Sequence, residues 1–412
     1  MGVVLRLLHL SDIHFYETET ANKALNLDEA VRARLLIDVG EMVARLGPCD
    51  AVLVVGDIGA RGDPSDYATA TQFLVGVTEL VGCDDNRVIC VPGNHDVNRS
   101  AHTATHDALR GQLRRVPANT ISDTLQRLLA DPPAAETLLR PFEAYNEFAL
   151  AFGCDISASA PTWVPKKLPL GSRDLVIHGI TSSWIADSSD DDTEDSRKLV
   201  TGVFQYAPVG ADPSDISMTL CHHPVSWLRD VADVRQWDTA AHVILTGHEH
   251  SFGIEVDSGL RWVRIASGAV NPARAEDGWV PAYNIIELDD VESTDEQLRL
   301  RVYVRSWQDA QFGPDARFDD PEVITLELDR GGRRESKHVD VHPRALNDIE
   351  QAHGHRVMTA PPDRRRTLAR ELGFPGEPEI GLDGDRSILR WAAESGKLAE
   401  FAARLVEESL DG

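Results

Sequence analysis

The sequence of 412 residues is poor in basic side chains: 41 lysines and arginines face 67 aspartates and glutamates, for a formal net charge of -26 at pH 7. Sequence-independent binding to long nucleic acid relies on Lys and Arg to neutralise phosphates, so this balance argues against it. A nucleic-acid substrate is not excluded, because bound metal ions can reverse the field locally. The acidity otherwise serves solubility.

Cysteine is scarce, and no two cysteines form a C-x-x-C pair. The chain contains Cys49, Cys83, Cys90, Cys154 and Cys221, an odd number. Several adjoin apolar runs, where a reduced buried thiol is expected. The pattern argues against a paired-cysteine motif and fits a reducing cytoplasm.

Long apolar runs are also missing. No segment approaches the roughly 18 apolar residues that a membrane helix needs. The N-terminus lacks the basic region, apolar stretch and small-residue cleavage site of a signal peptide. We therefore expect a soluble, cytoplasmic protein without a membrane partner.

Apolar runs at 3–10, 51–55 and 87–91 predict three buried strands, and helical periodicity at 25–46 and 66–81 predicts the helices between them. Strands that alternate with helices indicate an α/β sheet with helices packed on it. The length favours two domains, or one large domain with an added module.

The pattern turns helical over 98–152, without a motif that carries chemistry. We interpret this segment as an insertion, either a cap near the site or a surface excursion. An acidic run at 187–195 reads as a solvated loop. Further strands are predicted at 174–180, 216–221 and 242–246, then a more antiparallel set at 261–266, 283–288 and 298–304, with the domain closing near residue 330.

Five short polar motifs follow in order, each where a strand is expected to end. They are Asp12-Ile13-His14, Gly56-Asp57 continuing to Gly62, Gly93-Asn94-His95-Asp96, His222-His223-Pro224 and Gly247-His248-Glu249-His250. The carboxyl ends of strands are where α/β sheets place ligand sites.

Carboxylates, imidazoles and an amide oxygen suit divalent manganese, iron or zinc. The glycines permit tight turns and close approach. If the segments are extended, residues two apart point the same way, so Asp12 and His14 would reach a common site, as would His248 and His250.

The order D-x-H, G-D-(x4)-G, G-N-H-D, H, G-H-x-H resembles the calcineurin-like metallophosphoesterase superfamily over about residues 1–330. The spacing is most similar to the cyclic-nucleotide phosphodiesterase branch. The resemblance implies an α/β fold, a four-layer α/β/β/α sandwich, here with the helical insertion and a small all-α C-terminal domain.

The resemblance also implies a role for each matching residue. Seven side chains would hold two divalent metal ions: Asp12, His14 and His250 the first, Asn94, His222 and His248 the second, with Asp57 bridging both. His95 would face the substrate, and Asp96 would fix the tautomer and orientation of the His95 ring. We expect Mn²⁺ as the metal, with iron, zinc and nickel as alternatives.

The sequence does not settle the role of some residues near the motifs. His223 is expected to have a structural or supporting role, and Arg61 either contacts phosphate or forms a surface salt bridge. The other histidines are treated as structural.

The tail 345–412, reached through a linker at 331–344, carries amphipathic helical stripes. Its segment RWAAESGKLAEF resembles effector-associated domains, the death-like adaptors of bacterial conflict systems. That resemblance implies homotypic association with a partner protein. The alternative is a helical tail that packs on the enzyme or makes it a homo-oligomer.

Together these features predict a two-metal phosphodiesterase that hydrolyses a nucleotide or nucleic-acid phosphodiester with metal-activated water, as a regulated effector in bacterial defence. A small cyclic-nucleotide phosphodiesterase or a phosphomonoesterase fits the same ligands. A catalytically silent protein-binding module is the alternative of another class.

Overall fold

The computed structural model describes residues 4–16, 27–161, 163, 165–187, 199–205, 215–230, 241–256, 261–271, 280–289, 297–315, 317–318, 320, 322–329, 362–374, 397, 400 and 404. The chain divides into two compact units, Met1–Arg333 and Arg334–Gly412. The acidic run beyond Asp187, the linker 331–344 and most of the tail lie outside the described residues.

The first sheet grows from the three predicted strands, β1 (Val4–Leu10), β2 (Ala51–Val55) and β3 (Val88–Val91), which pair in parallel. Every residue of β2 and β3 is buried, as expected for parallel strands covered on both faces. Antiparallel strands extend the sheet beyond β1: β10 (Ala282–Asp289), β11 (Gln297–Gln308), β12 (Gln311–Pro314) and β13 (Ile324–Asp329).

The second sheet has the strand order β4-β5-β6-β7-β9-β8. Its strands are β4 (Lys166–Leu170), β5 (Arg173–Ile180), β6 (Ile216–Cys221), β7 (Val243–Thr246), β8 (Gly253–Val256) and β9 (Val263–Ala266). Strands β5, β6, β7 and β9 pair in parallel.

The predicted grouping of 261–266 with the later strands is wrong. Strand β9 joins the second sheet, parallel to β7, whereas β10 and β11 complete the first sheet. An apolar alternation marks a strand but does not select its partner. Strands β4, β8, β12 and β13 were not predicted; β4 and β8 have mixed, partly exposed patterns that resemble loops.

Successive side chains of the second sheet point alternately into two hydrophobic clusters, one on each face. In β7, Val243 and Leu245 belong to the large hydrophobic cluster shared with the first sheet, whereas Ile244 belongs to a second cluster on the other face. Insertion residues such as Leu113 and Leu125 complete that second cluster. The two sheets therefore share one core, and helices cover the outer faces, which confirms the predicted fold class.

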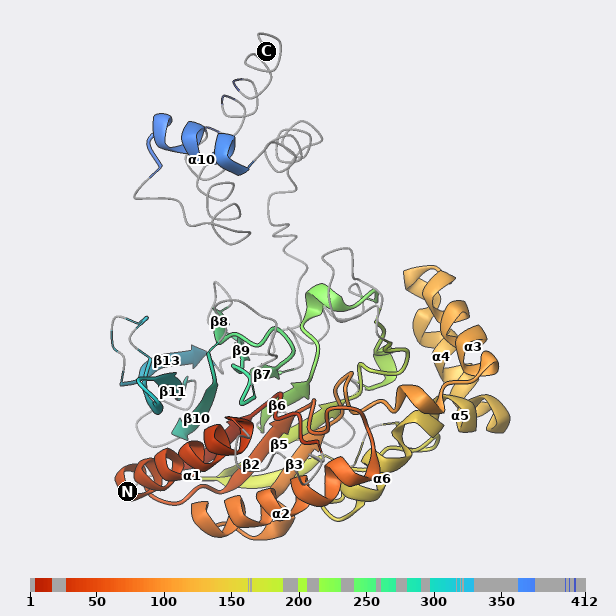
Figure 1. Cartoon of the computed structure of the whole chain (residues 1–412), viewed down its shortest axis with the longest axis horizontal. Coiled ribbons are helices and arrows are strands. Elements are labelled where there is room, and N and C mark those ends of the chain that lie inside the picture. Colours follow the sequence, from red (N-terminus) through yellow and green to blue (C-terminus); the bar gives the residue numbers. More distant parts are fainter. Residues whose placement is uncertain are drawn as a thin grey trace. The chain divides into compact units, whose positions relative to one another are not determined.

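Helices α1 (Leu27–Leu46) and α2 (Pro64–Val81) contact each other beside the first sheet (Figure 1). Helix α2 begins with a proline in its first turn and ends at Gly82, whose φ of 78° suits glycine.

The insertion forms four helices: α3 (Ala104–Arg115), α4 (Ile121–Ala130), α5 (Pro132–Leu139) and α6 (Glu143–Leu150). Helix α6 returns to α2, whereas α3, α4 and α5 group together (Figure 1). In the tail, α10 spans Pro362–Glu371. Of the helices in the described ranges, none is long and apolar enough to cross a membrane.

Main-chain hydrogen bonds tie the segments that follow the parallel strands to one another. After β1 and β2, the amide of Asp12 donates to the carbonyl of Gly56 (3.1 Å), and the amide of Phe15 donates to Ile58 (2.8 Å). The amide of Gly247 after β7 donates to the carbonyl of His222 after β6 (2.9 Å). Motifs far apart in sequence are thereby fixed at one edge of the two sheets.

Candidate metal centre

The backbone is strained where the polar motifs meet. Seven non-glycine residues in the described part of the chain have positive φ. Two, Asp309 and Ala310, form the turn between β11 and β12; the other five are predicted metal ligands, Asp12, His14, Asp57, His248 and His250. Such residues cost free energy and concentrate at functional sites.

These angles correct one prediction. Asp12 and His14, like His248 and His250, do reach a common region, but through left-handed turns rather than along extended segments. The strand has already ended at Leu10, so the side-chain alternation of a strand no longer applies.

One group of donors gathers around Asp12. Its Oδ1 lies 3.3 Å from Nε2 of His250 and 4.0 Å from Nε2 of His14. One donor atom from each of the three lies within 4.8 Å of the others. This is the set predicted for the first metal.

A second group gathers around Asn94. Its Oδ1 lies 3.1 Å from Nε2 of His222 and 3.1 Å from Nε2 of His223. Donor atoms of His222, His223 and His248 lie within 4.8 Å of one another. The three residues predicted for the second metal come together, and His223 joins them.

Asp57 stands between the two groups. Its Oδ2 lies 3.9 Å from Nε2 of His14 and 3.3 Å from Nε2 of His222. Its Oδ1 accepts a hydrogen bond of 2.8 Å from the amide of His95. A single carboxylate oxygen thus faces donors of both groups, the position predicted for a bridging ligand.

Two glycines make this approach possible. A Cβ at Gly93 would lie 2.1 Å from Oδ1 of Asp57, and one at Gly56 would lie 2.4 Å from Nδ1 of His222. Gly56 also has a φ of 81°. Any side chain at either position would displace a candidate ligand.

Neighbouring groups orient the donors. The carbonyl of Val55 lies 2.8 Å from Nδ1 of His222 and accepts a 2.8 Å hydrogen bond from Ser11 Oγ. Ser11 Oγ is also within hydrogen-bond distance of Asp12 Oδ2, which accepts a 3.1 Å hydrogen bond from the amide of His248. Fixing one ring nitrogen of a histidine leaves the other free to coordinate an ion.

The electrostatics favour a cation. Burial opposes the charged form of Asp57, but the imidazoles of His222 and His95 outweigh it and hold the pKa of Asp57 well below its usual range. Burial likewise opposes charge on His222, yet Asp57 and Asp12 raise its pKa to about 9. Two buried ionised carboxylates therefore attract positive charge.

The other rings suit coordination. Burial lowers the pKa of His14 to about 4 and that of His248 to about 3, so both are neutral at pH 7 and carry a free lone pair. Among the described residues, the buried atoms Asp12 Oδ1 and His14 Nε2 have no hydrogen-bond partner. Unpartnered buried donor atoms of this kind are suited to hold an ion.

His95 lies beside the first group. Its ring is edge-on to His14, with 4.6 Å between centroids, and its Nδ1 lies 3.0 Å from the carbonyl oxygen of Ala60. The prediction that Asp96 orients this ring is therefore wrong. The backbone carbonyl of Ala60 is the group next to Nδ1.

Asp96 instead holds two motifs together. Its carboxylate accepts hydrogen bonds from the amides of Ile58, Gly59 and Gly93 and from the hydroxyl of Tyr67. Burial and the nearby Asp57 raise its pKa to about 6. Asp96 thus links the segment after β2 to the segment after β3, and its effect on His95 is indirect.

Sequence reasoning left His223 outside the site. Its ring is fully buried, and its Nδ1 lies 2.8 Å from Oγ of Ser182, just after β5. The doubled histidine before Pro224 was the available signal. Arg61, in contrast, is largely exposed and lies 3.9 Å from Asp63, which favours the surface salt bridge.

A comparison with protein families matches residues 5–252 to the family described as calcineurin-like phosphoesterase. The metallophosphoesterase-like protein YydB of Bacillus subtilis (strain 168), itself uncharacterized, is 34% identical over 95 residues; the match covers 23% of this chain and only 18% of YydB.

Solved structures are similar at low identity. The calcineurin-like phosphoesterase YfkN from Bacillus subtilis is 12% identical, with 81% of this chain and 92% of that chain covered and a TM-score of 0.33. Vacuolar Protein Sorting 29 from Cryptosporidium parvum is 11% identical, with 79% and 98% covered and a TM-score of 0.33.

Proposed function

The chain belongs to the calcineurin-like phosphoesterase family of metal-dependent enzymes, and from that premise we propose that it is a two-metal phosphodiesterase acting on nucleotide or nucleic-acid phosphodiesters. The observation that carries the proposal is the position of Asp57, whose Oδ2 faces His14 at 3.9 Å and His222 at 3.3 Å. A carboxylate between two donor groups supports a pair of ions rather than one.

Phosphoesterases of this family use a dinuclear divalent metal centre, and the two donor groups fit one. We assign Asp12, His14 and His250 to one ion and Asn94, His222 and His248 to the other. Oxygen and imidazole donors suit Mn²⁺, with iron, zinc and nickel as alternatives. When bound, two such ions clamp phosphate oxygens and lower the pKa of a water for in-line attack.

His95 is the proposed general acid. The hydrogen bond of its amide to Asp57 and the contact of its Nδ1 with Ala60 fix the imidazole beside the donor groups. If Nδ1 donates to the carbonyl, Nε2 faces the substrate, and the ring serves as an acid when it carries a second proton on Nε2, which it passes to the leaving oxygen. A positioned imidazole can protonate the leaving oxygen and so avoid release of a free alkoxide.

His223 is proposed as a positioning residue. Held by Ser182 at Nδ1, it places Nε2 3.1 Å from Oδ1 of Asn94. Burial lowers the pKa of His223 well below its usual range, so the ring is neutral. A donated hydrogen bond from Nε2 would hold the Asn94 oxygen toward the second ion.

The test of the function is hydrolysis of bis-p-nitrophenyl phosphate by purified protein with Mn²⁺. We expect turnover with Mn²⁺ that a chelator abolishes and that added Mn²⁺ restores. Absence of turnover with any of manganese, nickel, iron and zinc would favour the catalytically silent module. The complete donor set supports the enzyme.

The substrate class needs a parallel assay on plasmid, single-stranded DNA, RNA, cyclic nucleotides and a phosphomonoester. The net charge of -26 favours a small substrate, whereas the adaptor-like tail favours a nuclease. Hydrolysis confined to cyclic nucleotides or to the monoester would replace the nucleic-acid proposal while leaving the two-metal chemistry in place.

The proposal for the tail is homotypic association in bacterial defence, and it is supported by the sequence resemblance alone. The test compares the full chain with a chain ending at Arg333, the last residue of unit 1. The full chain is expected to self-associate or to capture a protein with a similar segment. Equal behaviour of both chains would favour a tail without an adaptor role.

A further inference from the structure

A second cluster of metal-ligating side chains lies in the helical insertion, on residues that the five motifs do not include. His102 directly precedes Thr103, the N-cap of α3, and His106 lies in the first turn of that helix. The Thr103 hydroxyl accepts a 3.2 Å hydrogen bond from the amide of His106. This cap brings the two imidazoles together, stacked with 4.1 Å between centroids and 20° between planes.

The two rings carry unpartnered nitrogen atoms in a buried place. His106 is only 1% exposed, and neither of its ring nitrogens has a hydrogen-bond partner among the described residues. The same holds for the buried Nε2 of His102. Buried polar atoms are rarely left unpaired, so three in one place indicate a ligand that completes them.

A carboxylate completes the donor set. Asp107 follows His106 in α3, and one donor atom each from His102, His106 and Asp107 lies within 4.8 Å of the others. The stacked rings lie in nearly parallel planes, so binding one ion requires them to turn until their in-plane lone pairs converge, and the carboxylate adds an oxygen. We propose that His102, His106 and Asp107 bind one zinc-class divalent ion, separate from the candidate metal centre.

The protonation state agrees with this geometry. Burial, with His102 and Arg110 adding to it, lowers the pKa of His106 to about 4. Burial and Arg110 also lower the pKa of His102. Both rings are therefore neutral at pH 7, and an ion would not have to displace a proton.

Charged side chains of both signs surround the two rings. Asp107 and Asp187 act on His102 from one side of the balance, and the guanidiniums of Arg99 and Arg110 from the other. Arg110 pairs with Asp187, with Nη1 2.8 Å from Oδ2, and its Nη2 donates to Oδ1 of Asp107 at 2.9 Å, so Oδ2 is the Asp107 oxygen that we assign to the ion. Arg114 also pairs with Asp187, so the nearby arginines outnumber the carboxylates, and binding would rest on the imidazole donors rather than on net charge.

The donor types select the ion. Two imidazoles and one carboxylate suit Zn²⁺ better than Mg²⁺ or Ca²⁺, which prefer oxygen ligands alone. Three protein donors leave a fourth tetrahedral position for water. Since Asp187 follows β5 and pairs with both Arg110 and Arg114, an ordered α3 start would also secure the insertion against the second sheet.

The test counts zinc per full-length chain by elemental analysis after equilibration with Zn²⁺ and removal of the excess. A background in which both donor groups of the candidate metal centre are removed, Asp57→Asn with His14→Gln, His222→Gln and His248→Gln, isolates the new site. We expect one zinc per chain in that background and none after His102→Gln and His106→Gln are added. His178→Gln is the matched histidine control and should keep the ion.

Equal zinc content with and without the two histidines would overturn the proposal and leave water as the occupant. If the double variant fails to fold by circular dichroism, Asp107→Asn is measured instead, with zinc affinity expected to fall about tenfold. Unchanged affinity there would also overturn it. Since zinc content is counted in a background without the candidate centre, this result is independent of whether the chain hydrolyses phosphodiesters.

Discussion

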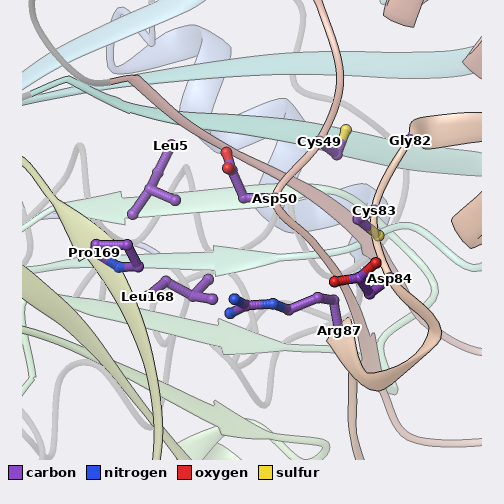
Figure 2. Close-up of a pocket in the computed structure, with 9 residues that line it drawn as sticks. All are labelled: Leu5, Cys49, Asp50, Gly82, Cys83, Asp84, Arg87, Leu168 and Pro169. Atoms are coloured by element: carbon purple, nitrogen blue, oxygen red, sulfur yellow. The ribbon is translucent and has the colours of Figure 1, made fainter.

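The two edges of the first sheet are built from the same three parallel strands but differ in chemistry. Beyond the carboxyl ends of β1, β2 and β3 lie Asp12, Asp57 and Asn94, among strained backbone and unpartnered donor atoms. At the amino ends lies a cavity of about 220 Å³, lined by Cys49, Cys83 and Arg87 among others (Figure 2).

The cavity lacks the features of a reactive site. Burial raises the pKa of Cys49 to about 12 and that of Cys83 to about 11, so both thiols are protonated and unreactive. Among its lining residues, only Gly82 has a positive φ, and it ends α2. Converging donor atoms and strained backbone, rather than the presence of a cavity, therefore support the proposed site at the carboxyl edge.

The largest expected effect comes from Asp57→Asn. The amide keeps the shape but loses the charge that both donor groups face, so phosphodiester hydrolysis should fall at least about 10³-fold. Arg87→Ala at the opposite edge is the control and should stay within about twofold of the parent chain, as for a surface change away from the site. Steady-state assays with Mn²⁺ measure both; equal losses would break the comparison.

His95→Gln should cost less and act differently. Loss of a positioned acid should lower the rate of hydrolysis by about 10²-fold, the lower end for such a group. Bound metal should remain as in the parent chain, because His95 is not an assigned ligand. A leaving group as good as p-nitrophenolate should show a smaller loss than a poor one. A loss of metal in this variant would argue that His95 is a ligand.

Ser182→Ala and His223→Gln test whether His223 supports the group of donors around Asn94. Each should weaken binding of one of the two ions by about 10- to 100-fold, the usual cost of an outer partner. Metal titration followed by calorimetry separates the two ions. An unchanged affinity in both variants would return His223 to a purely structural role.

The smallest effect is expected at a strained residue that lies outside the candidate metal centre. Ala310 has a φ of 66° in the turn between β11 and β12. Ala310→Gly should stabilise the fold by up to about 1 kcal/mol, because glycine adopts this conformation without a Cβ clash. Denaturant unfolding measures the gain, and hydrolysis should not change. A loss of stability would contradict the strain argument.

Much of this centre could be predicted from the sequence because each motif directly follows the strand that positions it. The strands before Asp12 and Asp57 are short apolar runs, and each ends at a polar motif that marks the strand end. Parallel pairing then brings those ends to one edge. The α/β fold is confirmed, whereas the ligand assignment stays a prediction that the observed distances support.

The remainder depends on long-range contacts. The ring of His223 is fixed by Ser182, 41 residues earlier, and Asp96 bonds to Ile58 and Gly59 rather than to His95. Neither pairing has a local signature. The parallel pairing of β9 with β7 was missed for the same reason, because the apolar pattern of a strand does not specify which strand it pairs with.

Diffraction at the manganese absorption edge from crystals soaked in Mn²⁺ tests the central claim most directly. The account predicts two anomalous peaks about 4 Å apart, one on each side of the Asp57 carboxylate. A single peak, or none within reach of Asp57, would contradict it.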